Sequence, residues 1–298
     1  MGINERINVS LQTDQGLVRD HNEDFVTCWE PQNDGEATKH GWLYIVADGV
    51  GGADAGEVAS QFASERVIAH YLANSETKDW GRRLINAMQS ANTDLRQMVM
   101  ERNENKRMAT TMVAAVIQGK QVLIGNVGDS RGYHWHNGRL RQITKDQSLV
   151  AKLVEEGAIS EAEAVNHPHK NVILYSIGSE RSPKMDLFRV NIQPDDAIIL
   201  CSDGLTRHVS DEEIGRVLEN EPPAEAATRL IDMANSRGGQ DNISVGILRF
   251  STQPEEEGKT AVLATTAPTS QTTLLLYTFL LSIVQTILIL LVWFWLRV

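Results

Sequence analysis

The stretch WLYIVADGVGG, at residues 42–52, joins a short apolar run to an acidic, glycine-rich turn. An apolar run bounded by turn residues is typical of a buried strand. Similar runs lie next to an Asp beside Gly or Asn at four places: Asp48-Gly49, Gly128-Asp129, Asp203-Gly204 and Asp241-Asn242. A fifth acidic cluster, Asn22-Glu23-Asp24, precedes another strand. One Asp-Gly pair alone predicts only a turn, but this recurrence predicts carboxylates gathered at the tips of buried strands.

Gathered carboxylates imply a particular chemistry. Several buried carboxylates at one place repel one another and need cations. Oxygen ligands favour Mg²⁺ or Mn²⁺, and zinc is disfavoured in a chain with only two cysteines, Cys28 and Cys201. Arg19 lies shortly before the Glu23-Asp24 cluster, and a guanidinium near metal-bound oxygens is suited to bidentate capture of a phosphate. Together these residues predict metal-assisted phosphoryl transfer to water.

The rest of the pattern mixes strands and helices without regular βαβ alternation. Strands are expected at 42–47, 110–117, 121–127, 132–136, 197–201 and 243–250. Helices are expected from residue 54 onward and at 80–100, 148–156, 211–219 and 224–236. This order predicts the α+β class with antiparallel sheets rather than a doubly wound fold.

Composition and charge exclude some classes of protein. The 298 residues carry a formal net charge of −11 and are 42% hydrophobic, which is typical of a globular protein. The acidic balance argues against a nucleic-acid binder, because phosphate backbones favour a basic face. We expect one large catalytic domain at residues 1–250, followed by a flexible linker at 251–273 that is rich in Thr, Pro and Ser.

The C-terminal stretch LLLYTFLLSIVQTILILLVWFWL, at residues 274–296, has no charge, Pro or Gly. As a helix it would span about 34 Å, against about 30 Å for the apolar core of a bilayer, so it predicts one transmembrane helix. The N-terminus lacks the pattern of a signal peptide, and cysteines are scarce. We therefore expect a single-pass membrane protein whose catalytic domain is cytoplasmic.

The acidic motifs, taken in order, resemble those of the metal-dependent PP2C-type (PPM) serine/threonine protein phosphatases. The resemblance covers about residues 8–250 and rests on Gly16–Arg19, Asn22–Asp24, Ala47–Gly52 with Ala55–Glu57, Val127–Arg131, Cys201–Leu205 and Gly239–Asn242. Val50, in place of the His found there in other members, resembles the bacterial branch. The resemblance implies two antiparallel sheets in a sandwich flanked by helices, an α-β-β-α order.

The resemblance also implies a role for each site residue. Asp48 would bridge two Mn²⁺ or Mg²⁺ ions, with the Gly49 carbonyl on one of them and Asp203 and Asp241 on the other. Glu23 and Asp24 would bind or order the waters on the metal ions, and Asp129 would help to hold a third, weaker ion. Arg19 would bind the substrate phosphate, and Asn242 would support the site. A metal-bridging hydroxide would attack phosphorus directly. Val50 cannot protonate the leaving group, so the general acid is unassigned, and residues 148–180 match a variable flap beside the site.

The implied partners are phosphorylated proteins and a cognate serine/threonine kinase, together with a membrane through residues 274–296. An alternative function is a non-catalytic pseudophosphatase that binds phosphoproteins, although none of the expected metal ligands is missing. Cys201 and Arg207 fit the Cys-x-x-Gly-x-x-Arg loop of cysteine-dependent phosphatases, but Asp203 would repel phosphate there. We interpret Cys201 as a core residue. His134 and His136 have a spacing suited to metal, but beside the turn at Asn137 we interpret them as a solvated strand face.

Overall fold

The computed structural model of the chain describes residues 6–51, 55–102 and 108–251. Its strands are β1 (Arg6–Asp14), β2 (Asp24–Trp29), β3 (Trp42–Val50), β4 (Ala109–Thr110), β5 (Met112–Gln118), β6 (Gln121–Val127), β7 (Arg131–His136), β8 (Arg139–Gln142), β9 (Asp186–Asn191), β10 (Ala197–Cys201) and β11 (Ile243–Ser251). Its helices are α1 (Asp34–His40), α2 (Ala55–Ala73), α3 (Trp80–Arg102), α4 (Leu149–Glu155), α5 (Glu161–Val165), α6 (Asp203–Thr206), α7 (Asp211–Asn220) and α8 (Pro223–Ser236).

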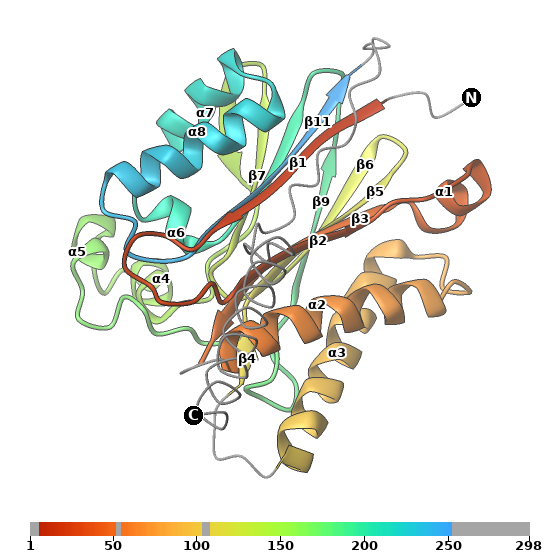
Figure 1. The fold of residues 1–298 in the computed structure, drawn as a ribbon, viewed down its shortest axis with the longest axis horizontal. Helices are drawn as coiled ribbons and strands as arrows, with labels where there is room; N and C mark the ends of the chain where they lie inside the picture. The colour runs from red at the N-terminus through yellow and green to blue at the C-terminus, as the bar shows by residue number, and fades with distance from the viewer. Residues whose placement is uncertain (1–5, 52–54, 103–107, 252–298) are drawn as a thin grey trace, which may run out of the picture. The chain divides into compact units, whose positions relative to one another are not determined.

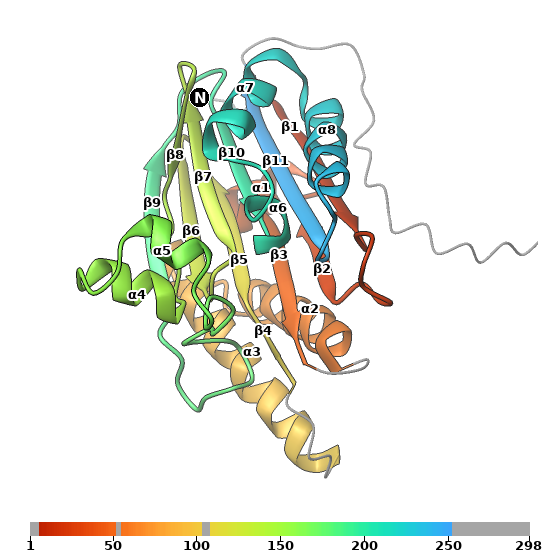
Figure 2. The ribbon, with the colours of Figure 1, turned by 90° about the vertical axis from the view of Figure 1, so that its left-hand side faces the viewer.

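Two antiparallel sheets lie at the centre of this part of the chain (Figure 1). The first sheet has the strand order β1-β11-β10-β7-β8, and the second has the order β2-β3-β5-β6-β9, with β4 paired to β3. Figure 2 shows the two sheets side by side, with α7 and α8 near the first and α2 and α3 near the second. The predicted α+β class with two antiparallel sheets and flanking helices is confirmed.

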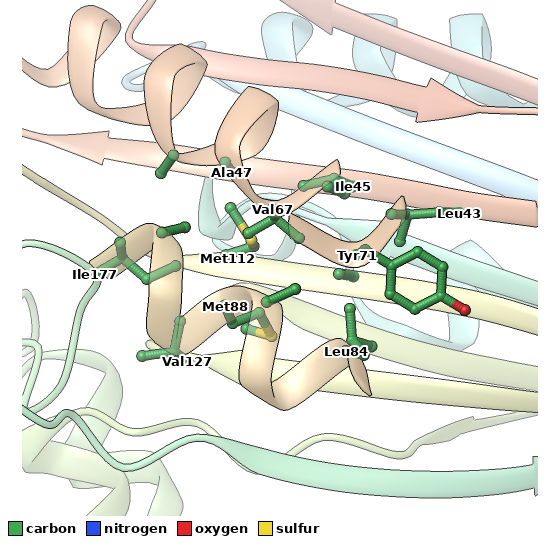
Figure 3. Close-up of a cluster of buried hydrophobic side chains, with 14 of the residues drawn as sticks. Leu43, Ile45, Ala47, Val67, Tyr71, Leu84, Met88, Met112, Val127 and Ile177 are labelled. Atoms are coloured by element: carbon green, nitrogen blue, oxygen red, sulfur yellow. The ribbon is translucent and has the colours of Figure 1, made fainter. Parts of the chain in front are cut away.

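The alternation of side chains along β3 explains how one strand serves two cores. Leu43 and Ile45 belong to the core that α2 and α3 cover (Figure 3). Tyr44 and Val46, which point the other way, belong to the core between the two sheets. A strand buried on both faces is apolar throughout, and this is why the run at residues 42–47 shows no polar alternation.

The same alternation of side chains along β10 determines which core contains Cys201. Ile198 and Leu200 face the core between the sheets, whereas Ile199 and Cys201 face the core that α7 and α8 cover. The layers therefore run from α2 and α3 through the second and first sheets to α7 and α8. Because β1 and β11 pair along their whole length, the loops that precede β2 and β11 lie at one end of the sandwich.

Two local differences from the sequence prediction have simple causes. The strand predicted at 42–47 continues through Asp48 to Val50, because β4 supplies partners for Gly49 and Val50. Strand β9 was not predicted; it lies at the edge of its sheet and is only partly buried, so its residues lack the apolar run that marks the central strands.

The described residues include no helix that is both long and apolar enough to cross a membrane. Their longest helix, α3, has 23 residues but carries charges such as Arg82, Arg83 and Asp94. The linker predicted at 251–273 and the span predicted at 274–296 lie outside the described residues. The predicted localisation, a single-pass membrane protein with a cytoplasmic catalytic domain, is corrected on this finding, because it requires a spanning helix and the described part of the chain provides none.

Candidate active site

The predicted aspartates meet at one end of the sandwich. The register of β2 and β3 places Asp24 directly opposite Asp48. The Ser202 hydroxyl, just after β10 of the other sheet, donates a hydrogen bond of 2.7 Å to Asp24 Oδ2. A Cβ atom added to Gly204 would lie 1.9 Å from the carbonyl oxygen of Asn242, so the segments after β10 and before β11 are in close contact. Residues far apart in the sequence are thus brought to one place.

The acidic loop before β2 packs tightly against the start of α2. The Gly49 amide donates to the Glu23 carbonyl at 3.1 Å, and the Ser60 hydroxyl donates to the same oxygen at 2.6 Å. A Cβ atom on Gly49 would lie 2.3 Å from the Gly56 carbonyl, and one on Gly56 would lie 2.7 Å from the Glu23 carboxyl carbon. Only glycine fits at position 49, where the neighbours are backbone atoms, whereas a side chain at position 56 would push the Glu23 carboxylate aside.

Asn242 holds the loop that carries Arg19 and Glu23. Its Oδ1 accepts a hydrogen bond from the Glu23 amide at 2.8 Å. Its Nδ2 donates to the carbonyls of Gln15 and His21, both at 2.9 Å. The side chain is buried and uses its amide group in three bonds, so it connects the start of β11 to the whole β1–β2 loop.

The carboxylates raise one another's pKa values. Burial is the largest cause and raises the pKa of both Asp24 and Asp129 to about 7, with Asp203 adding to each. The pKa of Asp48 lies well above its usual range because of burial and because Asp24, Asp203, Asp129 and Asp241 surround it. Burial also raises the pKa of Asp203, although Arg207 opposes the shift. Such a cluster is electrostatically unfavourable on its own and is relieved by cations.

Asp129, after β6, has a feature that points to a ligand. Its Oδ1 atom is buried and has no hydrogen-bond partner among the described residues. Its position is fixed by the preceding residue, because Gln147 accepts from the Gly128 amide and donates to the Gly128 carbonyl, both at 2.9 Å. A buried carboxylate oxygen without a partner calls for an explanation such as an ion.

Arg207 is the residue that the sequence analysis did not place in the site. Its Nη1 donates to Asp241 Oδ2 at 3.0 Å, and its Nη2 pairs with Asp203. Burial lowers its pKa, but Asp203 and Asp241 outweigh this effect and raise it. Arg19 pairs with the other oxygen of Asp241 at 2.8 Å. The available signal was the spacing of Asp203 and Arg207, four residues apart on one helical turn.

This donor set fits Mn²⁺ or Mg²⁺. It consists of carboxylates, which are hard oxygen ligands. Raised carboxylate pKa values and an unpartnered carboxylate oxygen are both features that a divalent cation would relieve. Of the predicted residues, Asp24, Asp48, Asp129, Asp203 and Asp241 interact electrostatically with at least one other member. Glu23 lies beside them. Burial raises the pKa of Glu23 most, Arg19 lowers it and Asp241 raises it.

Cys201 is unsuited to nucleophilic attack. It is fully buried on β10, and burial raises the pKa of its thiol to about 12. Its interpretation as a core residue is confirmed. A cysteine attacks only as its thiolate, which Cys201 does not form at neutral pH. We therefore expect Cys201→Ala to retain any phosphate-ester hydrolysis to within about threefold, and EDTA to abolish it in both proteins. Initial rates with and without added Mn²⁺ measure this. A cysteine mechanism requires the reverse result, with activity that survives EDTA and is lost in the variant.

Comparisons with known proteins agree with this geometry. The Protein phosphatase 2C family profile matches residues 22–244. Serine/threonine phosphatase stp of Listeria monocytogenes is 39% identical over 246 residues, which cover 80% of this chain and 94% of that protein. The crystal structure of the Mycobacterium tuberculosis phosphatase PstP/Ppp aligns with a TM-score of 0.73 and 34% identity, over 82% of this chain and 99% of that one.

A further solved structure bears on the cofactor. The catalytic domain of the serine/threonine protein phosphatase PstP, in complex with two manganese ions, aligns with a TM-score of 0.70 and 34% identity, over 82% of this chain and 98% of that one. The predicted enzyme class and its manganese or magnesium cofactor are confirmed at the level of the family. By its sequence match, its two-sheet fold and its oxygen-donor site, the chain belongs to the protein phosphatase 2C family of metal-dependent serine/threonine phosphatases.

Proposed function

We propose that this chain hydrolyses phosphoserine and phosphothreonine in proteins, at the cluster of aspartates described above. In this proposal Asp48 and the Gly49 carbonyl hold one divalent ion, and Asp48, Asp203 and Asp241 hold a second. The observation that supports it is the convergence of carboxylates with raised pKa values from both sheets. The catalytic function belongs to residues 1–250, because the last strand that the structure describes, β11, completes the first sheet by pairing with β1 and β10.

The outer residues of the site have separate roles in this proposal. When bound, the two ions supply an activated water and neutralise the charge on the phosphate. Glu23 and Asp24 would order the waters of the bound ions, and Ser202 holds the Asp24 carboxylate by a hydrogen bond. Asp129, with its unpartnered Oδ1, is the ligand for a third, weaker ion.

In this proposal Arg19 binds the substrate phosphate. Its side chain is 47% exposed and pairs with Asp241 at the edge of the cluster. Its loop is anchored to the segment before β11, because the Leu17 amide donates to the Gly239 carbonyl at 2.8 Å. A guanidinium that is anchored at its backbone and open to solvent can form a bidentate contact with a phosphate. Val50 has no proton to donate, so in this proposal the leaving alkoxide takes its proton from water.

The substrates of such an enzyme are phosphorylated proteins, and its counterpart is a serine/threonine kinase that phosphorylates the same proteins. The test uses the full chain with Mn²⁺ and matched peptides that carry phosphoserine, phosphothreonine or phosphotyrosine. We expect release of inorganic phosphate from the first two and loss of that release in Asp203→Asn. Binding of the phosphopeptides without any turnover at saturating Mn²⁺ would instead indicate the pseudophosphatase alternative.

Arg207 should compete with the metal. Its guanidinium neutralises Asp203 and Asp241, the same carboxylates that we assign to the second ion. We expect Arg207→Ala to bind Mn²⁺ about tenfold more tightly, which corresponds to about one charge-assisted hydrogen bond that the metal no longer displaces. Calorimetric titration of the metal-free chain with Mn²⁺ measures this. The exposed Arg216 on α7 gives the control variant Arg216→Ala, and weaker binding in Arg207→Ala alone would contradict the competition.

Removing the metal should make stability fall as pH rises. The folded chain has pKa values of about 7 at Asp24 and Asp129, against about 3.9 for an unfolded Asp. From about pH 4 to 7 the folded state therefore binds more protons than the unfolded state, so the free energy of unfolding decreases with pH. We expect the EDTA-treated chain to melt at a lower temperature at about pH 8 than at about pH 5, and Mn²⁺ to stabilise it more at the higher pH. A melting temperature of the EDTA-treated chain that rises steadily over this range would contradict the prediction.

A further inference from the structure

A second cluster of metal-ligating side chains lies away from the aspartates. His134 and His136 are two residues apart on β7 and so face the same side of the first sheet. Asp196 comes immediately before β10, whose Ala197 pairs with Trp135, so its carboxylate lies beside both imidazoles. His134 Nε2 is 2.8 Å from Asp196 Oδ2, and His136 Nδ1 is 2.6 Å from Asp196 Oδ1. One ligand atom from each of the three residues lies within 4.8 Å of the others.

The carboxylate at the centre of this cluster is held rigidly as an anion. The Asp196 side chain is only 2% exposed, and its Oδ2 also accepts from the Gln193 amide at 2.9 Å. Burial alone would raise its pKa, but hydrogen bonds from His136, the Gln193 amide and His134 outweigh burial and hold the pKa below its usual range. A buried carboxylate that stays ionised needs a cationic or hydrogen-bonding partner on each oxygen.

We propose that His134, His136 and Asp196 form a second metal site, which takes a transition-metal ion such as Zn²⁺. Two imidazoles and one carboxylate are a common protein ligand set for such ions. The aspartate cluster offers only oxygen and suits Mg²⁺ or Mn²⁺, so the two sites differ in selectivity. His136 is 37% exposed, which leaves the remaining coordination positions open to water.

The site is separate from the phosphatase centre. Strand β7 begins at Arg131, next to the Asp129 loop, and ends at His136. At about 3.3 Å per residue, the five steps between these residues correspond to about 17 Å along the strand. The proposed metal would join the end of β7 to the start of β10, two neighbouring strands of the first sheet. Its expected effect is therefore on stability rather than on chemistry.

A supporting contact for one of the ligands is already present. The Asn137 side-chain amide lies 3.0 Å from His136 Nε2. If a metal binds Nδ1, Nε2 carries the proton and needs an acceptor, which Asn137 provides once its amide is flipped, since the amide oxygen and nitrogen positions are interchangeable by rotation. Asn137 and Gly138 both have positive φ, at 48° and 74°, in the tight turn of the β7–β8 hairpin, and this turn holds the amide beside the ring.

A hydrogen-bonded cluster without metal is the competing interpretation. The observed separations of 2.6 and 2.8 Å are hydrogen-bond lengths, whereas ligands on a tetrahedral Zn²⁺ are about 3.3 Å apart. Metal binding thus requires each of the two imidazoles to carry its proton on the other ring nitrogen, and the ligand atoms to separate by about 0.5–0.7 Å. The exposed side chain of His136 has room for this shift.

The test titrates the full chain with Zn²⁺ in excess Mg²⁺, which occupies the aspartate cluster, and follows heat release and melting temperature. We expect one further equivalent of Zn²⁺ to bind and to raise the melting temperature. His136→Gln should weaken this binding at least about 100-fold, since loss of a ligand costs more than loss of a supporting contact. The double variant His167→Gln/His169→Gln is the matched control, because these histidines have the same spacing and lie with their rings 5.7 Å apart in an exposed loop.

The imidazole ¹⁵N resonances of His134 and His136 give a readout that does not depend on activity or on folding of a variant. Selective shifts of these two residues on addition of Zn²⁺ support the site. The absence of Zn²⁺ binding, or binding that His136→Gln leaves unchanged, overturns it. Either result leaves the proposed phosphatase function intact, because that function is tested by Mn²⁺-dependent turnover.

Discussion

Replacing Asp48 by Asn should lower kcat for phosphopeptide hydrolysis by at least about 10³-fold, or about 4 kcal/mol of activation free energy. Asn has nearly the same shape but no charge, and it would remove the carboxylate that we propose bridges both ions. The same change should raise the stability of the metal-free chain. The pKa of Asp48 lies well above its usual range because burial and four other aspartates disfavour its charge, and Asn has no charge to disfavour.

The two effects separate loss of function from loss of fold. Initial rates at saturating Mn²⁺ measure the first, and thermal unfolding in EDTA measures the second. Asp232→Asn on the exposed face of α8 is the control, and we expect it to change neither quantity. An Asp48→Asn protein that keeps a tenth or more of the wild-type rate would show that Asp48 does not bridge the ions.

Replacing Asn242 by Ala should lower the free energy of unfolding by about 3 kcal/mol, since it removes three partly buried hydrogen bonds and leaves the Glu23 amide unpaired. For a domain of this size the melting temperature should fall by roughly 6–12 °C. Activity should fall as well, because the loop that Asn242 holds carries Arg19 and Glu23. We expect KM to rise and the affinity for Mn²⁺ to fall even below the new melting temperature.

Asn242→Asp tests whether the donors matter. It keeps an oxygen for the Glu23 amide but loses the N–H groups that bond to Gln15 and His21, so it should be no more stable than Asn242→Ala. The exposed Asn166 provides a control, and Asn166→Ala should melt within about 2 °C of the wild type. Wild-type stability in Asn242→Asp would show that a single acceptor is enough to hold the loop.

The strands could be predicted because their signal is local. The apolar runs at residues 42–47 and 197–201 mark strands that are buried on both faces, and β10 was predicted with its observed bounds. The edge strand β9 escaped prediction, because an element that is half exposed carries a weaker pattern. The extension of β3 to Val50 also escaped, since it depends on pairing with β4, some sixty residues later in the chain.

The candidate site was predicted unevenly, for a related reason. The aspartates were found because each lies at or next to the end of a recognisable strand and because the motifs in order resemble a known family. Arg207 was not placed in the site, since its pairing with Asp241 spans 34 residues. His134 and His136 were interpreted as a solvated strand face, whereas in the structure both pair with the buried Asp196. Nothing near the two histidines in the sequence indicates that Asp196, 60 residues on, lies between them.

Apolar periodicity and the order of the acidic motifs were enough to establish the class of the fold, the buried central strands and the oxygen chemistry at their tips. These features depend on backbone geometry and side-chain type, which act over a few residues. Two pairings followed only from the strand order of the first sheet, which brings β7, β10 and β11 side by side: that of Arg207 with Asp241, and that of Asp196 with the two imidazoles of β7. Charge interactions depend on distance and burial, and between residues far apart in the chain both quantities exist only in the folded molecule.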